Sequence, residues 1–167
     1  MEIINCAERD IDNMVHLYRG AIEFQKQNGF NEWKEFDRDL VSLEIKQKRQ
    51  WKIVIDGEIA CIFCVAYSDP LLWRELDDSN SIYLHRIATN QKYKGKGFTG
   101  VIIEWARKQW PDARYIRMDT WAENRALTAY YLKYGFSIAG YCQLDKEAKD
   151  LPLHYSSLKL VLLQMEV

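Results

Sequence analysis

A lysine- and glycine-rich segment carries the strongest chemical signal of the sequence. It runs Lys92-Tyr93-Lys94-Gly95-Lys96-Gly97-Phe98-Thr99-Gly100, between an extended apolar run and a helical pattern. Glycines let the backbone turn sharply and leave several N–H groups without a neighbouring Cβ atom. Unpaired N–H groups at the start of a helix, together with the positive end of its dipole, favour an anion, and the three lysines add positive charge. We therefore expect this loop to bind a pyrophosphate.

Two other phosphate-binding motifs compete for the same residues. A Walker A loop requires GxxxxGK followed by Ser or Thr, and no such string is present. The dinucleotide pattern GxGxxG is present as Gly95, Gly97 and Gly100, and Asp119 lies about where a ribose-binding acid is expected. Against it, the connection that begins at Thr89 is long and lysine-rich, and too few residues follow for a full dinucleotide domain. A dinucleotide-binding oxidoreductase therefore remains a less favoured alternative.

A second segment, residues 124–136, adds independent information. It contains Asn124, then Tyr131 after six intervening residues, and then Gly135-Phe136. With the upstream loop, it resembles the GNAT N-acetyltransferase superfamily, whose pattern is Gln/Arg-x-x-Gly-x-Gly/Ala followed by Asn-(x)6-Tyr-(x)3-Gly-Phe. Lys92 stands where the family usually has Gln or Arg. The order of predicted elements also fits, so the resemblance covers essentially the whole chain.

This resemblance implies an N-acetyltransferase that uses acetyl-CoA (coenzyme A) as co-substrate, without a metal. The acetyl group would pass to a primary amine of a small molecule or to a peptide N-terminus, by direct attack in a ternary complex. Two splayed parallel strands would hold the pantetheine arm, the first of them over residues 84–89. The implied cofactor-binding residues are Ile87, Ala88, Thr89, Lys92, Lys94, Gly95, Lys96, Gly97, Phe98, Thr99, Gly100, Asn124 and Tyr131.

Amine acetylation needs a base for the ammonium proton and an acid for the departing thiolate. Tyr131 occupies the position of the family's general acid, and a phenol with a pKa of about 10 is protonated at neutral pH. The strand predicted over residues 81–89 contains no carboxylate, so His85 is our candidate base, with a water chain as competitor and His154 as a weaker candidate. Strand alternation predicts that Tyr83, His85, Ile87 and Thr89 share one face. The missing carboxylate also leaves open a non-catalytic acyl-CoA-binding sensor or interaction module.

The acceptor pocket should form from the loop between the first two helices, the fourth strand and the last strands. Aromatic, acidic and histidine side chains from these segments are its candidate lining. They are Trp33, Glu32, Tyr67, Trp121, His154 and Tyr155.

Hydrophobic periodicity predicts the elements that must position these residues. Strands are expected at 3–6, 51–55, 58–67, 81–89, 115–121, 136–144 and 155–165, and helices at 11–22, 36–45, 97–109 and 124–134. Asp56-Gly57, between two extended runs, predicts a β-hairpin, and residues 69–80 are expected to be irregular. The result is an α/β (α+β) fold with a mixed, mostly antiparallel sheet of about seven strands and helices on both faces. The crossover from residue 81 to 121 makes those two strands parallel.

Composition limits the other possibilities. The 167 residues are 48% apolar, which suits a single domain over residues 1–167. Basic and acidic residues number 23 and 24, which argues against a nucleic-acid or membrane-surface partner. No apolar stretch is long enough to span a bilayer and no leader precedes the first strand, so we expect a cytoplasmic protein, either a monomer or a homodimer. Cys61 and Cys64 lie on a predicted strand, where their sulfurs would point to opposite faces, so a metal or redox pair is not expected.

Overall fold

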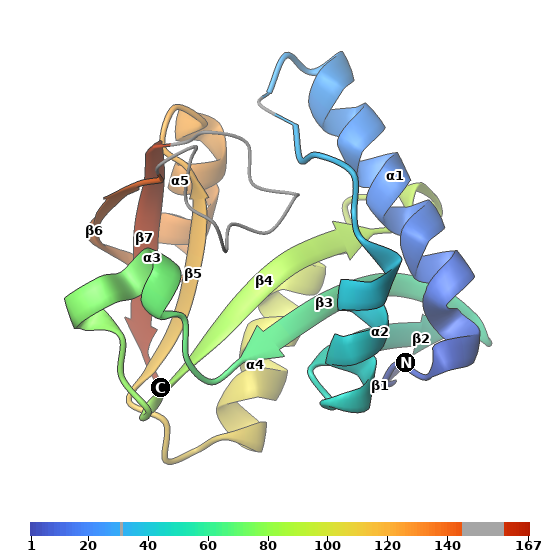
Figure 1. The fold of residues 1–167 in the computed structure, drawn as a ribbon, viewed down its shortest axis with the longest axis horizontal. Helices are drawn as coiled ribbons and strands as arrows, with labels where there is room; N and C mark the ends of the chain where they lie inside the picture. The colour runs from blue at the N-terminus through green and yellow to red at the C-terminus, as the bar shows by residue number, and fades with distance from the viewer. Residues whose placement is uncertain (31, 145–158) are drawn as a thin grey trace.

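The protein is built on a seven-stranded sheet, which the computed structural model describes together with its helices for residues 1–30, 32–144 and 159–167 (Figure 1). The strands lie in the order β1-β2-β3-β4-β5-β7-β6. All neighbouring strands are antiparallel except β4 and β5, which are parallel. The strands are β1 (Glu2–Asn5), β2 (Gln50–Ile55), β3 (Glu58–Ala66), β4 (Ser81–Thr89), β5 (Tyr115–Trp121), β6 (Ser137–Gln143) and β7 (Lys159–Glu166). The predicted fold class is confirmed.

Helices cover both faces of the sheet. Met14 of α1 and Val41 of α2 pack with Ile62 on one face, whereas Ile102 of α4 packs with Phe63 on the other, so α1 and α2 lie in front of the sheet in Figure 1 and α4 lies behind it. The α-helices are α1 (Ile11–Gln27), α2 (Arg38–Lys46), α3 (Pro70–Trp73), α4 (Phe98–Gln109) and α5 (Arg125–Lys133). No helix in the described ranges is both long and apolar enough to cross a membrane.

Local sequence signals account for most element boundaries. The predicted hairpin turn is confirmed, because both Asp56 and Gly57 have positive φ angles, 51° and 81°. Asp37 caps α2 by accepting a hydrogen bond from the Asp39 amide at 2.8 Å. The stretch predicted to be irregular contains the short helix α3, which begins at a proline.

The two cysteines of the CxxC motif are buried, and neither forms a disulfide bond. Cys61 and Cys64 are both free thiols, and each is at most 1% exposed. Burial raises the pKa of Cys61 to about 12 and that of Cys64 to about 11. Cys61 belongs to the core under α4, whereas Cys64 faces Arg86 and Glu44 on the other side of the sheet. The prediction that the two side chains point to opposite faces is therefore confirmed.

The parallel strands β4 and β5 separate soon after they begin. Their paired residues run only from Ser81 opposite Tyr115 to Tyr83 opposite Arg117. Beyond that point β4 remains paired with β3, and β5 with β7, so each strand keeps a partner on its outer side only. Figure 1 shows the two strands diverging from this shared start. The predicted splayed parallel pair is confirmed, and its inner edges carry unpaired backbone groups.

A β-bulge in β4 changes which side chains face which helix. The register between β3 and β4 shifts between the pairs Ile62–Ala88 and Cys64–His85, and Arg86 has a positive φ of 52°. Two consecutive residues, His85 and Arg86, therefore point to the same side of the sheet. The alternation predicted from sequence is wrong beyond His85, because Ile87 lies on the α4 face with Cys61, opposite to Tyr83.

Candidate active site

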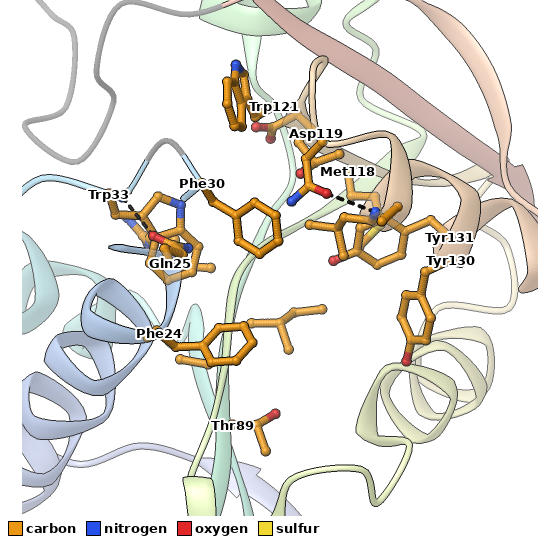
Figure 2. Close-up of a pocket in the computed structure, with 18 of the residues that line it drawn as sticks. Phe24, Gln25, Phe30, Trp33, Thr89, Met118, Asp119, Trp121, Tyr130 and Tyr131 are labelled. Carbon is orange, nitrogen blue, oxygen red and sulfur yellow. Dashed lines mark hydrogen bonds between the residues drawn. The ribbon is translucent and has the colours of Figure 1, made fainter. Parts of the chain in front are cut away.

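The opening between β4 and β5 is a cavity of about 510 Å³. Figure 2 shows its two ends, with Thr89 at one and Trp121 and Asp119 at the other. Most of its lining comes from α1 with the loop that follows, the outer half of β4, the outer half of β5, and α5, and the loop after β4 and one residue of β7 complete it. Both splayed strand edges therefore face one continuous space.

At the Thr89 end, the chain enters the glycine-rich loop and then α4. Gly95 and Gly97 have φ angles of 80° and 70°, a conformation that glycine adopts without strain. Among the described residues, the backbone amides of Gly95, Gly97, Phe98 and Thr99 donate no hydrogen bond. The α4 N-terminus thus offers free N–H groups, and Lys94 reaches the cavity wall beside them.

The other loop residues named from sequence are positioned differently. The Lys92 ammonium is paired with the Glu58 carboxylate of β3, so its charge is already partly compensated. Lys96 is exposed, and the Lys94 ammonium lies 4.4 Å from the centroid of the Phe24 ring.

Gly100 has a packing role instead of an anion-binding one. Its amide donates to the Gly97 carbonyl at 3.0 Å, and a Cβ added to it would lie 2.9 Å from the Tyr134 ring. Its place in a GxGxxG string reflects this close contact between α4 and the end of α5.

The second sequence motif builds the wall opposite β4. Asn124 caps α5 by accepting a hydrogen bond from the Leu127 amide at 3.0 Å. Tyr131, one residue beyond Tyr130 on α5, lines the same cavity. Burial raises the pKa of Tyr131 well above its usual value, and the neighbouring Tyr130 and the Asp119 carboxylate add smaller increases. Its phenol therefore stays protonated at any physiological pH.

The histidine of β4 lies between two carboxylates. His85 Nδ1 is 3.4 Å from Asp119 Oδ1 of β5, and His85 Nε2 is 3.6 Å from Asp69 Oδ2, just before α3. The three side chains are 14%, 10% and 13% exposed, in the order His85, Asp119 and Asp69. They are the one group in the described residues whose ligand atoms lie close enough together to suit a metal ion, although each ring nitrogen already faces a carboxylate. We call these three residues the trio.

Only one member of the trio reaches the cavity. Asp119 is among the lining residues, whereas His85 lies behind it and is not part of the described lining. The sequence suggested Asp119 only as the ribose-binding acid of the dinucleotide alternative, because its proximity to His85 depends on where β5 lies beside β4. Burial raises the pKa of Asp69; His85 opposes that rise and the like charge of Asp119 adds to it.

The predicted acceptor residues are only partly brought together. Trp33 and Trp121 both line the cavity, as does Phe30, which sequence reasoning missed (Figure 2). Glu32 lines a separate hollow on the outer side of α1 and pairs with Lys34 at 3.7 Å.

Of the three further predicted acceptor residues, the structure describes only Tyr67. The prediction for Tyr67 is wrong, since its ring packs against Trp110 with centroids 5.9 Å apart, away from the cavity. It follows the end of β3, and its ring lies beside the residue that follows α4. His154 and Tyr155 lie outside the described residues.

A buried ion pair supports the floor of the cavity. Both carboxylate oxygens of Glu44 lie 2.6 Å from the Arg86 guanidinium, and Gln50 donates to the same carboxylate at 2.7 Å. Burial by itself would raise the pKa of Glu44, but Arg86 and then Gln50 bring it below its usual value. Arg86 is thus a cavity residue whose charge is already neutralised.

Comparison with known proteins agrees with this geometry. The model of the Acetyltransferase (GNAT) family matches residues 21–136. The Uncharacterized N-acetyltransferase YesJ of Bacillus subtilis is 26% identical over 141 residues, which is 78% of each chain.

Two solved structures illustrate the shared fold. A GNAT-family acetyltransferase from Listeria monocytogenes has a TM-score of 0.77 at 21% identity, covering 99% of this chain and 94% of its own. The putative acetyltransferase yncA from Salmonella typhimurium, solved with its cofactor acetyl-CoA, has a TM-score of 0.66 at 13% identity, with coverages of 99% and 93%. The family match spans more than half of the sequence and includes the glycine-rich loop, both splayed strands and α5, so the chain belongs to the GNAT acetyltransferase family.

Proposed function

We propose that the protein, acting as one domain over residues 1–167, transfers an acetyl group from acetyl-CoA to a primary amine. The observation that carries this proposal is the cavity between the splayed strands, which has free amides near one end and Tyr131 on its wall. GNAT-family membership supports acetyl transfer, and the acetyl-CoA in the yncA structure supports the choice of donor.

The residues present fit an acyl-CoA. The amides of Gly95, Gly97, Phe98 and Thr99 would bind the pyrophosphate, with Lys94 beside them. The unpaired edge of β4 at residues 84–89 would hydrogen-bond the pantetheine amides as an added strand does. The thioester supplies an activated acetyl group.

Direct transfer then requires three proton movements. The acceptor ammonium loses a proton on the β4–β5 side, near the trio, and its nitrogen attacks the thioester carbonyl carbon. The thiolate leaves as the carbon–sulfur bond breaks, and it takes the phenolic proton of Tyr131, which solvent replaces. The nitrogen, now bonded to the acetyl carbon, releases its second proton to solvent. The products are an N-acetyl amide, free coenzyme A and one released proton.

The lining at the Asp119 end supports a cationic amine with an apolar body as acceptor. Phe30, Trp33 and Trp121 provide aromatic surface there, and Asp119 is the one carboxylate among the described lining residues. A small amine or a peptide N-terminus would meet this requirement.

A non-catalytic acyl-CoA-binding module is the second candidate, since β4 carries no carboxylate of its own. However, Asp119 and Asp69 are brought to His85 by neighbouring elements, so proton-accepting groups are present beside the cavity. This arrangement favours the enzyme. The dinucleotide alternative loses its basis, because Gly100 serves helix packing and Asp119 faces His85.

Calorimetry and thiol release test the proposal together. Acetyl-CoA should bind at micromolar concentrations, and a panel of primary amines should include one that liberates free coenzyme A thiol. Tyr131→Phe should lower kcat by about 10²-fold or more, as expected for loss of a general acid, with the Kd of acetyl-CoA nearly unchanged. Absence of binding would refute the proposal, binding without thiol release from any amine would favour the sensor, and full activity of the variant would remove Tyr131 from its role.

A further inference from the structure

The acceptor end of the cavity contains one carboxylate that no cation neutralises directly. Of the charged groups on the described lining, Arg86 is paired with Glu44. Lys94 lies against Phe24, toward the opposite end. Asp119 faces the cavity with only an imidazole beside it, so an incoming ammonium would meet this carboxylate before any other acidic group.

Behind Asp119 the polar groups continue in line away from the cavity. His85 approaches Asp119 with one ring nitrogen and Asp69 with the other. Asp69 Oδ2 is fully buried and, among the described residues, has no hydrogen-bond partner. A buried carboxylate oxygen without a hydrogen-bond partner is stabilised when it gains a proton, and burial already raises the pKa of Asp69.

Resting on the proposed function, we propose that Asp119 is the catalytic residue that takes the proton from the acceptor ammonium, and that His85 and Asp69 are positioning residues that carry this proton away. The N–H bond of the ammonium breaks and the proton moves to the Asp119 carboxylate. It then passes to Nδ1 of His85, while the Nε2 proton moves to Asp69 and later to solvent. This assigns His85 a place behind the base instead of direct contact with the acceptor.

Within residues 1–30, 32–144 and 159–167, few other titratable groups face the trio. Asp77 lies beside Asp69, accepting from its amide at 2.8 Å, and Cys142 of β6 and Tyr131 of α5 lie within electrostatic reach. Burial raises the pKa of the Cys142 thiol and of the Tyr131 phenol, so both are neutral at working pH. The Asp77 carboxylate is ionised, since hydrogen bonds keep its pKa low despite the opposing effect of burial. The pH dependence of the acceptor reaction should therefore report the trio.

The experiment compares Asp119→Asn, His85→Gln and Asp69→Asn with the wild type, using an amine that the thiol-release panel identifies. At pH 7, Asp119→Asn should lower kcat/KM for the amine by about 10²–10³-fold, as expected for loss of a general base. The difference in kcat/KM between the variant and the wild type should shrink about tenfold per pH unit toward pH 10, because the fraction of deprotonated amine, which needs no base, rises with pH. His85→Gln and Asp69→Asn should show smaller deficits, about tenfold, that narrow in the same way.

Controls separate this inference from the proposed function. The acetyl-CoA Kd and the melting temperature should stay near wild-type values in all three variants, and Asp112→Asn, in an exposed turn, should keep full activity. An Asp119→Asn deficit that is equal at every pH, or no deficit, overturns the relay while the acetyltransferase stands. Activity that EDTA abolishes and Zn²⁺ restores would overturn it in favour of a metal site. A wild type that binds acetyl-CoA but acetylates no amine would refute the proposed function and the relay together.

Discussion

Replacing Glu44 by Gln should destabilise the protein more than any other change of one charge in its described part. The Glu44 side chain is 4% exposed, and its two oxygens face a guanidinium that is 7% exposed. The substitution keeps the shape and leaves Arg86 charged, buried and without a counter-ion of equal proximity. Arg86 also holds the bulge of β4 at a positive φ, a conformation that costs roughly 1–2 kcal/mol in a residue other than glycine.

The size of the effect follows from this burial. Removing one partner of a buried ion pair costs about 3–5 kcal/mol, which is a large part of a total stability of about 5–15 kcal/mol. For a chain of this length, the melting temperature should fall by on the order of 10 °C. The folded-state pKa of Glu44 is lowered, so its stabilising effect is present above the unfolded pKa of about 4.3 and is lost as pH falls through the lower folded value.

Urea denaturation at pH 7 and at pH 3 measures the difference in the free energy of unfolding between the wild type and Glu44→Gln. A double-mutant cycle with Arg86→Met should show coupling of about 1–3 kcal/mol, because the second change removes the uncompensated charge. Arg49→Met is the matched control, since that guanidinium is 26% exposed and 3.5 Å from Glu44, and it should cost less than about 1 kcal/mol. Equal unfolding midpoints for the wild type and Glu44→Gln, or strictly additive effects in the cycle, would refute the reasoning.

Three further predictions concern the loop, the helix contact and the thiols. Gly100→Ala should lower the free energy of unfolding by about 1–3 kcal/mol, because its Cβ would lie 2.9 Å from the Tyr134 ring. Gly20→Ala, at an open position of α1, should stabilise the protein slightly. A lower melting temperature for Gly20→Ala than for Gly100→Ala would contradict the packing. Lys94→Met should raise the Kd of acetyl-CoA about tenfold and make that Kd less dependent on salt. Calorimetry at two ionic strengths measures both effects, and an unchanged Kd would contradict a role for Lys94. Cys61, with its pKa raised to about 12 by burial, should resist iodoacetamide at pH 8 until urea is added, and rapid labelling of the native protein would show that it is accessible.

Sequence patterns predicted the positions of α1, α2, α4 and the central strands because these elements bury periodic apolar faces. The helix α5 buries no side chain completely, and the Asn124-to-Phe136 motif located it instead. The hairpin at Asp56-Gly57 and the splayed strands also follow from local chemistry and from the resemblance between residues 92–136 and the family motifs. The helix α3 was missed because four residues are too few for a periodic signal. Its apolar members Leu72 and Trp73 could have revealed that this stretch packs against the sheet.

The catalytic geometry was less accessible to sequence reasoning. Strand alternation fails at Arg86, because an arginine with a positive φ looks like any other strand residue until its buried partner Glu44 is known. The meeting of His85 with Asp119 depends on the parallel register of β4 and β5, and that with Asp69 depends on the turn after β3. None of these distances is encoded by spacing along the chain.

The most direct test of acyl-CoA binding in this cavity is a titration of ¹⁵N-labelled protein with acetyl-CoA, followed by amide chemical shifts. The free amides of Gly95, Gly97, Phe98 and Thr99 should shift most, together with those on the open edge of β4. Amides of β1 and β2, at the far side of the sheet, should not move. Saturation with acetyl-CoA that leaves the glycine-rich loop unshifted, or that shifts another face of the sheet instead, would contradict the account.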